Sequence, residues 1–142
     1  MRKLVVFAVK ALLLSFVCVP IAELQPVFTA EPSNPFPVLE GNNITLEWSY
    51  DLRGGTFRRA EFEEVIASGT VLIADVVGSL GQTPSHLRDK YKGRLQLNVT
   101  ATQTSITILE ANRTVDSKNY QFKVVPTTAP ITSAVRISVQ CK

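Results

Sequence analysis

The chain offers few side chains for catalysis. His86 is its only histidine, and it lies in the turn-rich segment 81–86, Gly-Gln-Thr-Pro-Ser-His. A serine hydrolase would need this imidazole, but the sequence contains no Gly-x-Ser-x-Gly elbow to hold a nucleophile. We therefore expect His86 on an exposed loop and no enzyme activity.

The one acidic cluster consists of Glu61, Glu63 and Glu64. On a strand, Glu61 and Glu63 would share a face, where they could act as a hydrolytic carboxylate pair or hold calcium. Because Arg58 and Arg59 lie beside them, a mixed-charge solvent face is the favoured interpretation. The sequence has no Cys/His metal spacing, phosphate-binding glycine loop or dinucleotide fingerprint, so we expect no cofactor and no metal.

The N-terminus has the pattern of a secretory signal peptide. Arg2 and Lys3 precede an apolar run that Lys10 interrupts and Pro20 ends. A membrane span needs about 20 apolar residues, and this run is too short on either side of Lys10. We expect a leader over residues 1–22, no further transmembrane segment, and a location outside the cell or on its surface.

The leader also accounts for the basic excess of the chain. Of the 15 lysines and arginines, three lie in residues 1–22, which leaves 12 basic residues against 12 acidic ones. The nearest basic cluster, residues 88–94, is short and contains Asp89. A nucleic-acid partner needs a clustered basic surface, so none is expected.

Beyond the leader, which contains Cys18, one cysteine remains, Cys141. An odd cysteine in an oxidising compartment predicts either an intermolecular disulfide or a free thiol. Three Asn-x-Thr sequons, at Asn43, Asn98 and Asn112, are expected to be usable for N-glycosylation on the secretory route.

Short alternating segments predict an all-β fold. Ile44, Leu46 and Trp48, for example, alternate with polar residues, and similar segments are separated by Gly, Pro and Asn. Since each strand would have one apolar face, two packed sheets are the simplest arrangement. The eight expected strands are 37–40, 44–50, 57–65, 70–77, 95–99, 106–108, 120–124 and 135–139. We divide the chain into the leader, a linker over 23–35 and one domain over 36–142.

The spacing of several segments resembles the variable type of immunoglobulin domain. Residues 38–50 resemble the family's A′ and B strands, with Trp48 at the position of the first cysteine. Phe62, 14 positions after Trp48, stands where the family has its buried tryptophan. Residues 91–94 resemble the start of strand D. Residues 116–122, Asp-Ser-Lys-Asn-Tyr-Gln-Phe, resemble the F-strand signature, with Phe122 in place of the second cysteine.

This resemblance implies an immunoglobulin-like Greek-key β-sandwich of two antiparallel sheets. It also implies that Tyr120 forms the tyrosine corner and that Arg94 and Asp116 form a salt bridge. Because both framework cysteines are replaced, we interpret Trp48, Phe62 and Phe122 as an aromatic cluster that compensates for the missing disulfide. The Gly-x-Gly bulge of antigen-receptor domains is absent, which argues against their mode of pairing.

The resemblance further implies an extracellular recognition or adhesion domain. It would bind a protein, either a second copy or another surface protein, through the sheet that contains strands C, C′, F and G or through the loops at one end. By strand alternation the candidate residues are Arg59, Glu61, Glu63, Gln121 and Lys123. The alternatives are a secreted β-sandwich that binds or hydrolyses carbohydrate, a structural role, and the N-terminal fragment of a longer receptor.

Overall fold

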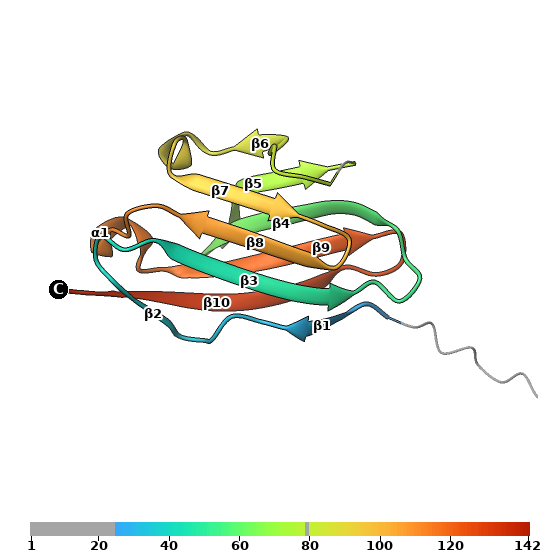
Figure 1. The fold of residues 1–142 in the computed structure, drawn as a ribbon, viewed down its shortest axis with the longest axis horizontal. Helices are drawn as coiled ribbons and strands as arrows, with labels where there is room; N and C mark the ends of the chain where they lie inside the picture. Colours follow the sequence, from blue (N-terminus) through green and yellow to red (C-terminus); the bar gives the residue numbers. More distant parts are fainter. Residues whose placement is uncertain (1–24, 79) are drawn as a thin grey trace, which may run out of the picture.

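The structure is a computed structural model that describes residues 25–78 and 80–142. The expected leader over residues 1–22 lies outside the described residues. The chain folds into two packed β-sheets (Figure 1). This arrangement confirms the all-β sandwich expected from the alternating segments.

In the described part of the chain, ten strands and two short helical turns make up the sandwich. The strands are β1 (Val27–Ala30), β2 (Phe36–Leu39), β3 (Ile44–Asp51), β4 (Phe57–Ile66), β5 (Gly69–Val77), β6 (His86–Leu87), β7 (Leu95–Val99), β8 (Gln103–Ile108), β9 (Asn119–Pro126) and β10 (Ile131–Gln140). The helical turns are a 3-10 turn (Asp89–Tyr91) and α1 (Arg113–Asp116).

One sheet has four strands in the order β1-β3-β8-β7, and the other has six in the order β2-β10-β9-β4-β5-β6. All pairings are antiparallel except that of β2 with β10, which is parallel. The parallel pair departs from the expectation of two purely antiparallel sheets. Among the described strands the chain crosses from one sheet to the other five times: at β1–β2, β2–β3, β3–β4, β6–β7 and β8–β9.

The structure corrects the expected linker over residues 23–35. Within it, β1 pairs with β3, with Val27 opposite Asp51 and Phe28 opposite Tyr50. The short strand β6 was also not expected, and it carries His86, which is exposed as expected but is not in a loop. Both strands are very short and depend on pairing with a distant strand, so alternation within their own sequence cannot reveal them.

Alternating residues of the long strands form the core. In β3, Ile44, Leu46, Trp48 and Tyr50 are buried, while Thr45 and Glu47 are exposed. This alternation follows from the two-residue period of a strand. Each long strand therefore contributes an apolar face to a single layer between the sheets.

A cluster of four aromatic rings runs through the middle of this layer. The ring of Trp48, from the four-stranded sheet, lies 4.6 Å from that of Phe122 and 6.4 Å from that of Phe62, measured between centroids. Phe62 in turn stacks on Tyr120 at 5.3 Å. The indole nitrogen of Trp48 donates a hydrogen bond of 2.9 Å to the buried Ser133 hydroxyl. We call Trp48, Phe62, Tyr120 and Phe122 the aromatic column.

Replacement of Trp48 by alanine should lower the free energy of unfolding by about 3–5 kcal/mol, because it leaves a large cavity between the sheets. It also leaves the buried Ser133 hydroxyl without its donor. Denaturant titration measures the effect. The control is Glu47→Ala, at the exposed residue that precedes Trp48 in the same strand. It should change the free energy of unfolding by less than about 0.5 kcal/mol. A loss below about 1 kcal/mol for Trp48→Ala would show that the ring does not support the core.

Candidate functional site

At one end of the sandwich, an ion pair and hydrogen bonds converge on Asp116. This carboxylate is fully buried, and the Arg94 guanidinium donates to it at 2.7 Å. Its second partner is the backbone N–H of Asn112, also at 2.7 Å. The Tyr120 hydroxyl donates a hydrogen bond of 3.2 Å to the backbone carbonyl of Asp116, which is the geometry of a tyrosine corner. The structure thus brings Arg94, Asp116 and Tyr120 together in a structural tie between the sheets.

Burial dominates the electrostatics of this tie. It raises the pKa of Tyr120 far above its ordinary value of 10, and the nearby Tyr91 and Asp116 add to the shift. The hydrogen bond to Asp116 raises the pKa of Arg94. The tyrosine therefore stays neutral and the arginine stays charged across the whole physiological range.

The outer face of the six-stranded sheet carries a second group of polar residues, which we call the charged face. Its members are Arg59, Glu61 and Glu63 on β4, Asp75 on β5, and Gln121 and Lys123 on β9. Glu61 lies directly opposite both Lys123 and Asp75, and Glu63 lies opposite Gln121. The strand register therefore sets acidic and basic groups side by side across three strands.

These side chains are bonded to one another. Arg59 bridges two carboxylates, with its Nε 2.9 Å from Glu61 and its Nη2 2.8 Å from Asp75. Lys123 pairs with the other oxygen of Glu61, and Gln121 donates to Glu63. One oxygen of Asp75, Oδ1, is buried without a hydrogen-bond partner among the described residues.

The face carries mixed charges, as expected, but the expectation that its carboxylates are solvated is wrong. Glu61, Glu63 and Asp75 are only 6–8% exposed, because the long side chains of Arg59, Lys123 and Gln121 fold across them. Asp75 was missed from the sequence, although its place opposite Glu61 in the β4–β5 hairpin could have indicated it. Cations and an amide thus hold these carboxylates in a fixed charge pattern.

Glu64 points to the opposite side of β4 and has its own set of partners. Lys118, Arg88 and Lys90 approach its carboxylate at 2.8, 3.0 and 3.2 Å. Burial alone would raise the pKa of Glu64, but the hydrogen bonds and charges of Lys118 and Lys90 outweigh burial and lower it to about 2. We call these four residues the Glu64 cluster. It uses much of the basic segment 88–94 in ion pairs within the domain.

The remaining candidates are exposed. The sequon residues Asn43, Asn98 and Asn112 are all exposed, and Asn112 also caps α1 by accepting from two backbone N–H groups. Cys141 is a free, exposed thiol that accepts a hydrogen bond from Arg113. Its intermolecular disulfide remains a prediction.

The described residues contain no group of three or more His, Cys, Asp or Glu side chains placed to hold a metal ion. Within residues 25–78 and 80–142, no helix has the length and apolar character that crossing a membrane requires.

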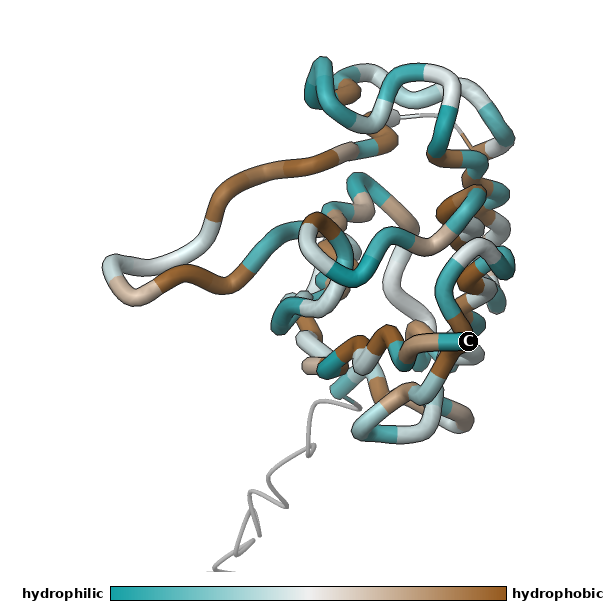
Figure 2. Tube along the Cα trace, turned by 90° about the vertical axis from the view of Figure 1, so that its left-hand side faces the viewer, coloured by the Kyte–Doolittle hydropathy of each residue, from teal (hydrophilic) through white to brown (hydrophobic). Residues whose placement is uncertain are grey.

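An apolar hairpin projects beside the charged face. The ends of β4 and β5 form an uncharged ribbon, residues 65–72, that extends away from the body of the sandwich (Figure 2). Ile66 is 41% exposed, and Val65 is also exposed. Val77, which lies opposite Arg59 on the charged face, is 49% exposed. Exposed aliphatic groups thus border a patterned set of charges.

Comparison with known proteins supports the architecture. No protein-family model matches this chain, and no curated protein sequence matches it. Many solved structures do match, among them the titin Ig tandem domains A164-A165, with a TM-score of 0.57 and 10% sequence identity. The match covers 84% of this chain and 51% of that structure, so this chain spans about half the length of the tandem. The chain therefore has an immunoglobulin-like fold.

Replacement of Glu64 by glutamine should lower the free energy of unfolding at pH 7 by about 2–3 kcal/mol. The folded pKa of Glu64 lies below its ordinary value of 4.5, so its contribution is complete above that pH. It is lost as the pH falls from about 4.5 towards about 2.

Denaturant titrations of the parent and of Glu64→Gln from pH 7 to pH 2 measure the difference between their free energies of unfolding. The gap between the two should narrow as the pH falls, whereas the exposed Glu47→Gln serves as control and should show little difference at any pH. A gap that stays constant from pH 7 to pH 2 would contradict the assigned role of Glu64.

Proposed function

We propose that this chain is a variable-type immunoglobulin domain that works outside the cell and binds a protein partner through the charged face. The strand order supports the variable type. In the sheet that contains β9 and β10, two additional strands follow β4: β5 pairs with β4, and β6 pairs with β5. Variable-type domains have two such additional strands in this sheet, and constant-type domains do not. The proposed secretory route rests on the leader pattern of residues 1–22.

The charged face is the observation that carries the proposal. Its carboxylates are held in place by Arg59, Lys123 and Gln121 before any partner arrives. A preformed charge pattern loses little conformational entropy on binding and discriminates strongly between partners. The exposed Val65, Ile66 and Val77 beside it supply apolar surface that a protein interface can bury.

A protein partner is favoured over a carbohydrate. Carbohydrate-binding sites usually present exposed aromatic rings, but the exposed large apolar side chains of the described residues are all aliphatic. The phenylalanines, tyrosines and tryptophan of this region lie in or against the core. The aliphatic surface and mixed charges suit a protein surface better.

The partner is either a second copy of this chain or another surface protein. A face with both signs of charge can meet a second copy in a twofold arrangement, with each cation opposite a carboxylate. The exposed Cys141 could then join two copies covalently. A longer receptor, of which this chain is the N-terminal part, would use the same face.

The test is a bead assay with the full chain secreted from a eukaryotic host. Beads that carry the chain should aggregate if the partner is a second copy, and should bind cells if the partner is another surface protein. Val77→Arg adds a cation beside Arg59 at the border of the charged face, where it replaces apolar surface that a partner would bury, and should lower either response about tenfold. Gln103→Arg makes the same kind of change on the opposite sheet and should leave the response unchanged.

Two results would contradict the proposal. The first is the absence of both aggregation and cell binding by the parent chain. The second is an equal loss of binding in Val77→Arg and Gln103→Arg when both variants have the parent's melting temperature.

A further inference from the structure

The outer face of the four-stranded sheet has a different chemistry from the charged face. In its central part, hydroxyl and amide side chains face outward, and Glu47 is the one charged residue among them. We call this set the neutral face; its members are Thr45, Glu47, Ser49, Gln96, Asn98, Gln103, Ser105 and Thr107. Such a surface can form many hydrogen bonds with a neutral polar ligand and has little charge to attract an ion.

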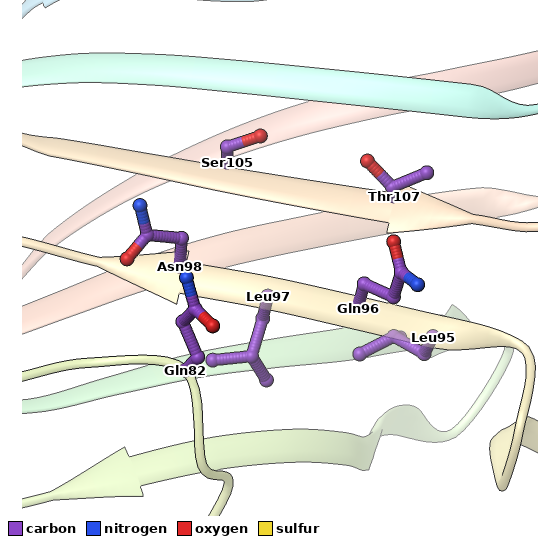
Figure 3. A pocket seen from close by; sticks show the side chains of 7 residues that line it. All are labelled: Gln82, Leu95, Gln96, Leu97, Asn98, Ser105 and Thr107. Atoms are coloured by element: carbon purple, nitrogen blue, oxygen red, sulfur yellow. The ribbon is translucent and has the colours of Figure 1, made fainter.

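A hollow of about 460 Å³ lies on the neutral face at β7 and β8 (Figure 3). Asn98 lies directly opposite Ser105, and Gln96 lies opposite Thr107. Because Ser105 and Thr107 are short, they leave room between the longer amide side chains. Gln82 approaches Asn98 from the loop after β5, and the hollow thus has amides on two sides (Figure 3).

Asn98 connects this hollow to a covalent modification. It is the first residue of the sequon Asn98-Val99-Thr100, and its exposed side chain lines the hollow. A second hollow of about 280 Å³ begins on the other side of Asn98 and Ser105. A sugar attached to Asn98 would therefore begin its chain within a polar depression rather than in open solvent.

We propose that Asn98 carries an N-linked glycan and that the first N-acetylglucosamine lies in this hollow. This inference rests on the secretory route of the proposed function. The host's glycosyl transferase would join Asn98 Nδ2 to the anomeric carbon of the sugar. The amide nitrogen loses a proton, and the bond from the sugar to its lipid diphosphate carrier breaks.

The residues of the hollow match the chemistry of this sugar. N-acetylglucosamine is uncharged and carries hydroxyl groups and an acetamide, each of which can donate and accept hydrogen bonds. Gln82 and Gln96 offer amide donors and acceptors, and Ser105 and Thr107 offer hydroxyl groups. Leu95, which is partly exposed, adds apolar surface for the C–H groups of the ring.

The positions of all three sequons are consistent with glycans on the neutral face and protein binding on the charged face. Asn43 and Asn112 lie in the turns at the α1 end, where Asn43 accepts from the backbone of Glu110 and Asn112 caps α1. None of the three asparagines belongs to the charged face. Glycans at these positions would cover the neutral face and one end of the domain, and would leave the charged face open to a protein.

The test uses the full chain secreted from a eukaryotic host, with Asn43→Gln and Asn112→Gln so that Asn98 is the one sequon left. Mass spectrometry should find Asn98 occupied. After trimming to a single N-acetylglucosamine, the melting temperature should exceed that of the same chain with Asn98→Gln by about 3–5 °C. The two corresponding chains from a bacterial host carry no glycan and control for the effect of glutamine itself.

Gln96→Ala tests the position of the sugar and leaves the sequon intact. In the trimmed chain, Gln96→Ala should remove about half of the increase in melting temperature that the sugar gives. In the Asn98→Gln chain, the same change should alter the melting temperature by less than about 1 °C. The proposal is overturned if Asn98 is unoccupied, or if the trimmed chain and the Asn98→Gln chain melt at the same temperature. A glycan found in the hollow while beads fail to bind would overturn the protein-binding role alone.

Discussion

Contact between the rings of Trp48 and Phe122 is the interaction on which the rest of the structure depends. The two rings, 4.6 Å apart between centroids, join opposite sheets. They stand where the resemblance to immunoglobulin domains would place the two framework cysteines. A disulfide across such a loop typically contributes about 4 kcal/mol, mainly by restricting the unfolded chain. Here burial of large aromatic side chains must supply the stability instead, and Phe62 and Tyr120 extend the stack within the six-stranded sheet.

The aromatic column also determines what faces outward. Phe62 and Phe122 lie opposite each other on β4 and β9, so their neighbours Glu61 and Lys123 must meet on the outer surface. The same alternation in β3 and β8 turns hydroxyl and amide groups outward on the other sheet. One packed layer thus produces two surfaces of different chemistry, one patterned with charges and one neutral. The two proposed roles, protein recognition and glycan attachment, follow this division.

Much of this arrangement can be predicted from the sequence, because it depends on local patterns. Alternation identifies the long strands, and the resemblance of residues 116–122 to the F-strand signature implies the contacts of Asp116 with Arg94 and Tyr120. The burial of Glu61 and Glu63 cannot be predicted in this way, because it depends on side chains that reach them from a strand about 60 residues later. The contact of Glu64 with Lys118 joins residues 54 positions apart, and the pairing of β1 with β3 also joins segments that are not adjacent, so local alternation reveals neither.

The most direct measurement uses the double variant Trp48→Cys and Phe122→Cys. If the two side chains meet between the sheets, the thiols should form a disulfide within one chain, with the spacing that such a bond requires. The oxidised variant should remain folded, whereas the reduced variant should be far less stable than the parent because it lacks both rings. Thiols that pair only between chains, or a reduced variant as stable as the parent, would contradict the account.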